Sequence, residues 1–326
     1  MKRLPQRRLG ATGPYAGEIA LGCMALSGMY GAADETEAIE VVHRAIECGV
    51  THLDTSDSYG NGHNEELLGR ALRGRRDEVV LSTKFGIQRE GLGRPKEITA
   101  ALEASLRRLD VDHVDMYYMH RPDRTTPVEE SVGAMAELAQ AGKIRHIGLS
   151  EVSAERLRVA HATYPIAVVQ QEYSLLSREP EEDLLPTMRE LGVGLVAYSP
   201  LSRGLLSGAF REPADVAQDD PRRRRYPRFG EGNLEENLAV VRRLDEVATR
   251  LGLPLAVLAI AWVLDAGEDV VPLIGTRSPA RLKADLRAAE VVLDDEVRTE
   301  LARIAPIGVA RGERYNATMS RRLDRP

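Results

Sequence analysis

Short apolar runs typical of β-strands alternate with helical patterns along most of this chain. Such runs occupy residues 19–24, 50–54, 79–84, 114–120, 144–150, 167–173, 194–200 and 270–275. Alternation of this kind is typical of βαβ units, whose neighbouring strands run parallel. Eight strands interleaved with helices favour a closed barrel over a doubly wound sheet. We therefore predict an α/β protein, a (β/α)8 TIM barrel with long loops at its C-terminal face, forming one domain over residues 1–326.

Helix start signals support this interpretation, and one segment interrupts it. Asp34 precedes an acidic turn and Pro95 stands in a first turn, as expected for helix N-termini. Residues 201–233, by contrast, are rich in Gly, Pro, Asp and Arg, and include four consecutive arginines at 222–225. We expect the arginine run to be a solvated loop, with a lid near an anionic cofactor as the alternative. The irregular tail after Pro306 is expected to close one side of a pocket.

Composition narrows the class of protein. The chain has 326 residues, 29% of them charged, and a net charge of -6, which gives no reason to expect a nucleic-acid or membrane partner. Cys23 and Cys48 are too few for a disulfide framework and lack metal-ligand spacing, so we predict a cytoplasmic protein without a metal site. The basic, polar start of the chain does not resemble a signal peptide. The oligomeric state stays open.

Polar, titratable residues stand at or just after the ends of three predicted strands. Asp54 ends the strand at 50–54 and Tyr59 follows it, Lys84 ends the strand at 79–84, and His120 ends the strand at 114–120. If these strands are neighbours in a barrel, their carboxyl ends meet at one rim, where such barrels place their reacting groups. A carboxylate, a phenol, an ammonium and an imidazole gathered there would form a proton-delivery site.

A phosphate site is predicted on the opposite side of the barrel. No Gly-x-Gly-x-x-Gly follows a strand and opens a helix, so a Rossmann fingerprint is absent. Barrels instead bind phosphate with the loops after their seventh and eighth strands. Here Gly275 permits close backbone approach, Ser278 can cap a helix, and Arg277 and Arg281 supply fixed positive charge.

These segments together resemble the aldo-keto reductase family from about Leu9 to Ile304. The matching stretches are Leu-Asp-Thr-Ser-Asp-Ser-Tyr-Gly at 53–60, Asn-Glu at 64–65, Ser-Thr-Lys at 82–84, Tyr-Tyr-Met-His-Arg-Pro at 117–122, Ile-Gly-Leu-Ser at 147–150, Gln-Gln-Glu-Tyr-Ser at 170–174, Ala-Tyr-Ser-Pro-Leu at 197–201 and Gly-Thr-Arg at 275–277. The loop 28–31, with residues 62–65, resembles the branch described as pyridoxal-reductase-like. The resemblance implies reduction of a small carbonyl substrate by NADPH.

The resemblance also implies a role for each strand-end residue. Tyr59 would be the general acid that protonates the alkoxide left by hydride transfer. Lys84 would favour the phenolate and lower the pKa of Tyr59, while Asp54 pairs with Lys84 and holds it in place. His120 would donate a hydrogen bond to the carbonyl oxygen or steer the substrate.

For NADPH, the resemblance implies an extended set of contacts. Ser150 and Gln170 would bind the nicotinamide carboxamide, and Tyr198 would stack on the ring. Arg277 and Arg281 would face the adenosine 2′-phosphate, and Asp285 would accept from the adenine amino group. The pyrophosphate and adenosine path would be lined by Ser199, Leu201, Arg203, Gly275 and Thr276.

Three positions depart from the family, and other functions remain open. Glu151 stands where asparagine is common, and Ala284 and Asp285 stand where glutamate and asparagine read adenine, which puts adenine recognition in doubt. One alternative is an NADPH-binding, redox-sensing subunit with little turnover; another is a Schiff-base aldolase with Lys84 as nucleophile. The carbonyl substrate and the physiological direction are not readable, although Met24, Met29 and Tyr30 suggest an apolar wall.

Overall fold

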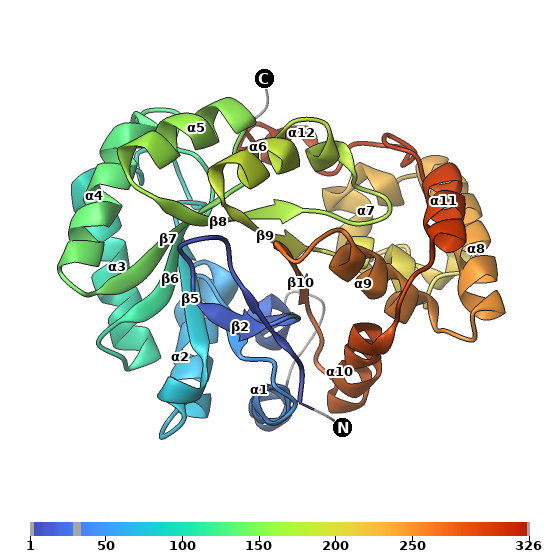
Figure 1. Ribbon diagram of the computed structural model, residues 1–326, viewed down its shortest axis with the longest axis horizontal. Coiled ribbons are helices and arrows are strands. Elements are labelled where there is room, and N and C mark those ends of the chain that lie inside the picture. The colour runs from blue at the N-terminus through green and yellow to red at the C-terminus, as the bar shows by residue number, and fades with distance from the viewer. Residues whose placement is uncertain (1–2, 29–33, 325–326) are drawn as a thin grey trace.

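A closed barrel of parallel strands forms the centre of the computed structural model, which describes residues 3–28 and 34–324 (Figure 1). The barrel strands are β3 (Ala20–Gly22), β4 (His52–Asp54), β5 (Val80–Phe85), β6 (Val114–Met119), β7 (Ile144–Ser150), β8 (Ile166–Glu172), β9 (Gly194–Tyr198) and β10 (Val270–Ile274). Consecutive strands pair throughout, and β10 closes the circle by pairing with β3. The predicted α/β class and the (β/α)8 barrel are therefore confirmed.

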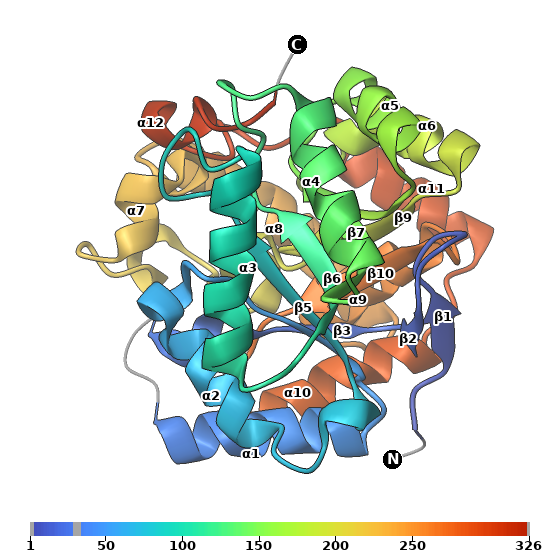
Figure 2. The same cartoon turned by 90° about the vertical axis from the view of Figure 1, so that its left-hand side faces the viewer.

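Helices surround the strands, as the two views in Figures 1 and 2 show. They are α1 (Glu35–Glu47), α2 (His63–Ala71), α3 (Pro95–Leu109), α4 (Val128–Gln140), α5 (Ala154–Thr163), α6 (Leu184–Leu191), α7 (Pro221–Arg225), α8 (Asn233–Arg250), α9 (Leu255–Asp265), α10 (Pro279–Asp285), α11 (Asp295–Ile304) and α12 (Ala317–Ser320). The strand–helix alternation did not predict α8 or α11. Within the described residues no single helix is long and apolar enough to cross a membrane, although the bent pair α8–α9 passes that test by length and composition.

The helix start signals act as the sequence predicts. The Asp34 carboxylate accepts hydrogen bonds from the backbone nitrogens of Thr36 (2.8 Å) and Glu37 (3.0 Å) at the start of α1. Pro95 occupies the first turn of α3, where its missing N–H costs nothing. Ser278 caps α10 by accepting from the nitrogen of Arg281.

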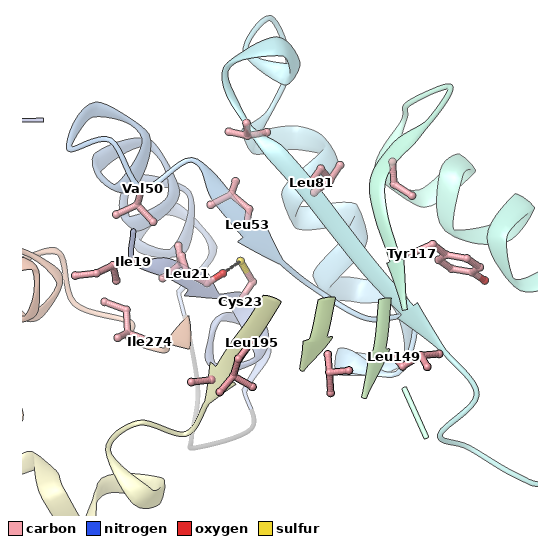
Figure 3. Close-up of a cluster of buried hydrophobic side chains, with 14 of the residues drawn as sticks. Ile19, Leu21, Cys23, Val50, Leu53, Leu81, Tyr117, Leu149, Leu195 and Ile274 are labelled. Atoms are coloured by element: carbon pink, nitrogen blue, oxygen red, sulfur yellow. Dashed lines mark hydrogen bonds between the residues drawn. The ribbon is translucent and has the colours of Figure 1, made fainter. Parts of the chain in front are cut away.

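Side chains alternate between the inside and the outside of the barrel. The outward residues, among them Leu21, Leu53 and Leu81, pack beneath the helices in the main apolar cluster (Figure 3). The inward residues at the lower level include Val80, Met116 and Val168, which form a separate apolar cluster. Above them the inward-facing positions carry polar and charged side chains. Among these, Asp54 pairs with Lys84 and accepts a hydrogen bond from Gln170.

An N-terminal hairpin closes the lower end of the barrel. Its strands are β1 (Gln6–Arg8) and β2 (Tyr15–Gly17), and its Leu9 side chain is buried with the inward-facing residues. Arg7 fixes the hairpin by donating to the backbone oxygens of Leu264, Gly267 and Val270. The eight-strand pattern did not predict this hairpin.

Residues 201–233 form a packed layer, and the arginine run that was expected to be a solvated loop forms the short helix α7. The layer contains the 3-10 turns η5 (Ser202–Ser207), η6 (Pro213–Asp215) and η7 (Pro227–Phe229) together with α7. Its apolar residues are buried in a second cluster against α8: Leu205, Leu206, Val216, Tyr226 and Phe229. Within the arginine run, Arg222 pairs with Asp220 and Arg224 is exposed. The prediction was wrong because these apolar side chains are too widely spaced to show a helical or strand period.

Replacing Gly10 with alanine tests the close approach of the hairpin to the barrel. Gly10 has a φ of 72°, and a Cβ there would lie 2.3 Å from the carbonyl oxygen of Ala167 and 2.7 Å from the nitrogen of Gly194. Both neighbours are backbone atoms of the barrel. We expect Gly10→Ala to lower the free energy of unfolding by about 2–4 kcal/mol, through left-handed backbone strain plus overpacking. Urea unfolding followed by circular dichroism measures this loss.

Gly74 provides the matched control. It has a φ of 74°, but a Cβ at this position would meet nothing within 4 Å. Gly74→Ala should therefore lower the free energy of unfolding only through left-handed backbone strain, by roughly 1 kcal/mol. Equal losses in the two variants would contradict the proposed close contact.

Candidate active site

A buried ion pair joins the carboxyl ends of β4 and β5. The Lys84 ammonium contacts the Asp54 carboxylate, and the two side chains are 0% and 1% exposed. Lys84 Nζ also donates to the carbonyl oxygen of Thr55 at 2.7 Å and to the Tyr59 hydroxyl at 3.3 Å. Tyr59 begins the short turn η2 (Tyr59–Gly62) in the loop that follows β4. The barrel therefore brings together the carboxylate, ammonium and phenol that the sequence predicted.

The second oxygen of Asp54 connects this group to a predicted cofactor residue. Asp54 Oδ2 accepts from the Ser82 hydroxyl at 2.9 Å and from Gln170 Nε2 at 3.0 Å. Ser82 was not predicted, although it lies two residues before Lys84 and so shares its face of β5. Gln170 is held by Asp54 with its amide orientation fixed.

Burial and pairing act in opposite directions on these groups. Burial disfavours the Lys84 ammonium, but Asp54 and Tyr59 outweigh it and raise the pKa of Lys84, so the side chain is charged. For Tyr59, burial dominates and raises the pKa above its usual value, while Lys84 lowers it. The influence of Lys84 on the pKa of Tyr59 is thus in the predicted direction, and burial, which the sequence does not show, outweighs it.

His120 lies beside Tyr59 at the end of β6. The two rings meet edge to face, with centroids 5.9 Å apart and an interplanar angle of 83°. His120 Nδ1 lies 3.1 Å from the Ser56 hydroxyl, a contact the sequence did not predict. Burial, followed by the charges of Arg121 and Lys84, lowers the pKa of His120 well below its usual value. The ring is therefore neutral, with one nitrogen engaged by Ser56.

Tyr198, a predicted cofactor residue, is tied to Glu151 and to the C-terminal tail. Its hydroxyl donates to Glu151 Oε1 at 2.6 Å and lies 2.8 Å from the Tyr315 hydroxyl. Arg314 donates two hydrogen bonds, of 2.8 and 2.7 Å, to the Glu151 carboxylate. The tail is thus placed against the pocket, as the sequence suggested.

The Glu151 carboxylate is already occupied by protein groups. Burial opposes its charge, but Arg314 outweighs burial and lowers the pKa of Glu151 to about 2. The backbone φ of Glu151 is 56°, a left-handed conformation that asparagine adopts more readily than glutamate. The fixed ion pair with Arg314 accounts for a glutamate here. It also leaves Glu151 less available to the carboxamide than the sequence suggested.

All the predicted site residues except Lys84, which lies behind Tyr59, line one cavity of about 1370 Å³. Its lining includes Tyr59, His120 and Ser150, which follow or end β4, β6 and β7, and Arg277 and Arg281 around the start of α10. Between and beside them the wall includes Gln170, Tyr198, Ser199, Leu201, Arg203, Gly275, Thr276, Ala284 and Asp285.

Details at the rim refine three predictions. Arg203 pairs with Glu172 at 3.1 Å and lies 4.4 Å from the centre of the Tyr226 ring, so it is held by protein groups as well as lining the cavity. Burial raises the pKa of Asp285 to about 6. Met24 lines the cavity, whereas Met29, Tyr30 and most of the 28–31 loop lie outside the described residues.

No group of three or more His, Cys, Asp or Glu side chains able to hold a metal occurs in residues 3–28 and 34–324. The residues that line the cavity supply proton donors, fixed cations and hydrogen-bonding groups. Such an arrangement can protonate an oxygen at one end and hold an elongated anionic molecule along the cavity.

Comparison with known proteins agrees with this geometry. The model of the aldo/keto reductase family matches residues 18–306. The glycerol dehydrogenase AKR11B4 from Gluconobacter oxydans is 29% identical, with a TM-score of 0.82 over 98% of this chain and 97% of that one. The thermostable aldo-keto reductase Tm1743, in complex with the inhibitor epalrestat, is 32% identical, with a TM-score of 0.76 over 92% of this chain and 100% of that one. This chain belongs to the aldo-keto reductase family of oxidoreductases, which act on carbonyl compounds and generally use nicotinamide cofactors.

Proposed function

We propose that this protein reduces an aldehyde or ketone to an alcohol, with NADPH as hydride donor and Tyr59 as proton donor. One observation carries the proposal: the Tyr59 hydroxyl lies 3.3 Å from the buried Lys84 ammonium and opens onto the large cavity. A phenol has a pKa near 10 in water, too high for ready donation at neutral pH. The adjacent cation opposes the effect of burial and stabilises the phenolate that donation leaves behind.

The described residues fit NADPH. Ser150 and the Asp54-bound amide of Gln170 supply hydrogen-bonding groups at the catalytic end of the cavity, and Tyr198 supplies an aromatic wall. Arg277 and Arg281 supply positive charge at the far end, where a 2′-phosphate would bind. When bound, NADPH would provide the hydride that reduces the carbonyl carbon.

His120 would hold the carbonyl oxygen. A neutral imidazole donates from only one nitrogen. If the Ser56 hydroxyl donates to Nδ1, Nε2 carries the proton and is available to the substrate oxygen. That bond would favour the developing alkoxide, which Tyr59 then protonates.

The Asp54–Lys84 pair argues against a Schiff-base aldolase. Such an enzyme needs a neutral lysine amine as nucleophile. Here the Asp54 carboxylate keeps Lys84 charged against the effect of burial, and the ammonium is inaccessible to solvent. The cytoplasmic location and a single domain over 1–326 remain predictions from the sequence.

Tyr59→Phe tests the proposed proton donor. The variant keeps the ring but removes the hydroxyl, so kcat for reduction should fall by about 10²- to 10⁴-fold, the usual contribution of general acid catalysis. The loss of NADPH absorbance with a panel of aldehydes measures kcat. NADPH affinity, measured by fluorescence titration, should be unchanged.

Tyr15 supplies a control, because its side chain is 63% exposed and lies outside the cavity. Tyr15→Phe makes the same chemical change there. Its activity should match that of the wild type. If Tyr59→Phe consumed NADPH as fast as the wild type across the panel, Tyr59 would not be the proton donor.

The double variant Arg277→Ala, Arg281→Ala tests the cofactor preference. Loss of two charge-assisted contacts should raise the Kd for NADPH by about 10- to 100-fold, while the Kd for NADH changes by less than about 3-fold. Arg287→Ala removes a charge on the turn that follows α10, away from the cavity, and should leave both values unchanged. Similar weakening of both nucleotides in the double variant would exclude the 2′-phosphate assignment.

A further inference from the structure

A buried arginine beside the predicted catalytic histidine makes no direct ion pair with a carboxylate of the described residues. Arg121 follows His120 and is 9% exposed. Its guanidinium donates to the His120 carbonyl oxygen at 2.6 Å, to the Ser150 hydroxyl at 3.3 Å and to the Tyr315 hydroxyl at 3.5 Å. All three acceptors are neutral, and the described part of the chain places no carboxylate in an ion pair with Arg121.

The other buried cations near this end of the cavity are all compensated. Lys84 pairs with Asp54, and Arg314 pairs with Glu151. Arg203 lies 3.1 Å from Glu172, and Arg228 lies 3.8 Å from the same carboxylate. A buried guanidinium without a direct anionic partner is unfavourable, and arginine cannot avoid this by losing its proton. Burial opposes the charge of Arg121, and the nearby Tyr315, Tyr198 and Glu151 outweigh it and raise the pKa of Arg121. The Glu151 carboxylate, however, is hydrogen-bonded to Arg314, so among these cations Arg121 is the one that has only neutral hydrogen-bond acceptors and no ion pair with a carboxylate of the described residues.

The position of Arg121 indicates where that anion would come from. Arg121 lines the cavity together with Tyr59 and His120, between which the carbonyl would bind. In the proposed function the 2′-phosphate of the cofactor pairs with Arg277 and Arg281, the pyrophosphate lies along Ser199, Leu201 and Gly275, and the nicotinamide carboxamide is neutral. An anion at Arg121 is therefore best supplied by the substrate.

We propose that Arg121 binds a carboxylate of the substrate, so that the protein acts on an aldehyde or ketone that also carries an acid group. The proposal rests on the proposed function, because it places the carbonyl at Tyr59 and His120. The guanidinium fork matches the two oxygens of a carboxylate. Apolar residues on the same wall, Met24, Leu26, Ile87 and Met319, would contact the carbon skeleton between the two groups.

The carboxylate would take no part in bond making. Reduction adds a hydride from NADPH to the carbonyl carbon and a proton from Tyr59 to the oxygen, giving the alcohol and NADP⁺. The acid group is unchanged and stays paired with Arg121. Its contribution is orientation and affinity, which appear in KM and in selectivity between substrates.

The test compares two probes that differ mainly in charge: 4-carboxybenzaldehyde and its neutral methyl ester, methyl 4-formylbenzoate. In Arg121→Gln, KM for the acid should rise by about 10- to 100-fold, the range for a hydrogen-bonded charge pair, and KM for the ester by less than about 3-fold. Arg121→Lys keeps the positive charge but not the forked guanidinium, so its KM for the acid should rise less than in Arg121→Gln. Arg321→Gln, at an exposed position on the C-terminal tail, makes the same charge change and should match the wild type.

Binding is measured separately from turnover, by the increase in Tm that each probe causes. The acid should stabilise the wild type more than the ester does, and Arg121→Gln should abolish that difference. If Arg121→Gln raised KM equally for the acid and the ester, the proposal would be overturned and Arg121 would be assigned to the alkoxide. If the variant weakened NADPH binding and left the selectivity between acid and ester unchanged, Arg121 would be assigned to the cofactor. If the wild type reduced no aldehyde, the proposed function would fail, while the Tm comparison would still decide whether Arg121 binds carboxylates.

Discussion

The buried ion pair between Lys84 and Asp54 is the interaction on which the rest of the site depends. Both side chains are almost fully inaccessible, so neither charge is stable without the other. Lys84 also donates a hydrogen bond to the carbonyl oxygen of Thr55, and Asp54 accepts hydrogen bonds from Ser82 and Gln170. These partners belong to different segments of the barrel. The pair therefore fixes the proposed proton donor and a proposed cofactor contact relative to each other.

A second buried pair performs a similar structural role for the C-terminal tail. Glu151 and Arg314 are 163 positions apart, and their two hydrogen bonds hold the tail beside Tyr198. Tyr315, next along the chain, reaches Tyr198, Arg203 and Arg121 with its hydroxyl. The wall of the cavity on this side is therefore built by charge pairing rather than by strand pairing, and its shape depends on those ions remaining paired.

Local patterns explain why the barrel and its strand-end residues could be predicted from the sequence. Strand runs, helix caps such as Asp34, and the positions of Asp54 and Lys84 are all visible within a few residues. The Glu151–Arg314 pair could not be found in this way, since nothing local relates a strand end to a tail. Local sequence also could not show that burial raises the pKa of Tyr59 more than Lys84 lowers it, because the depth of a side chain follows from the completed fold and not from its neighbours in sequence.

The central claim is that the Lys84 cation tunes Tyr59 as a proton donor, and the pH dependence of kcat/KM tests it most directly. Reduction requires the protonated phenol, so activity should fall as pH rises through its pKa. Replacing both partners, Asp54→Asn with Lys84→Met, leaves no unpaired charge. Because Lys84 lowers the pKa of Tyr59 more than Asp54 raises it, the alkaline limb of this variant should move to higher pH and its maximum should fall. An alkaline limb at the same pH in both proteins would contradict the account.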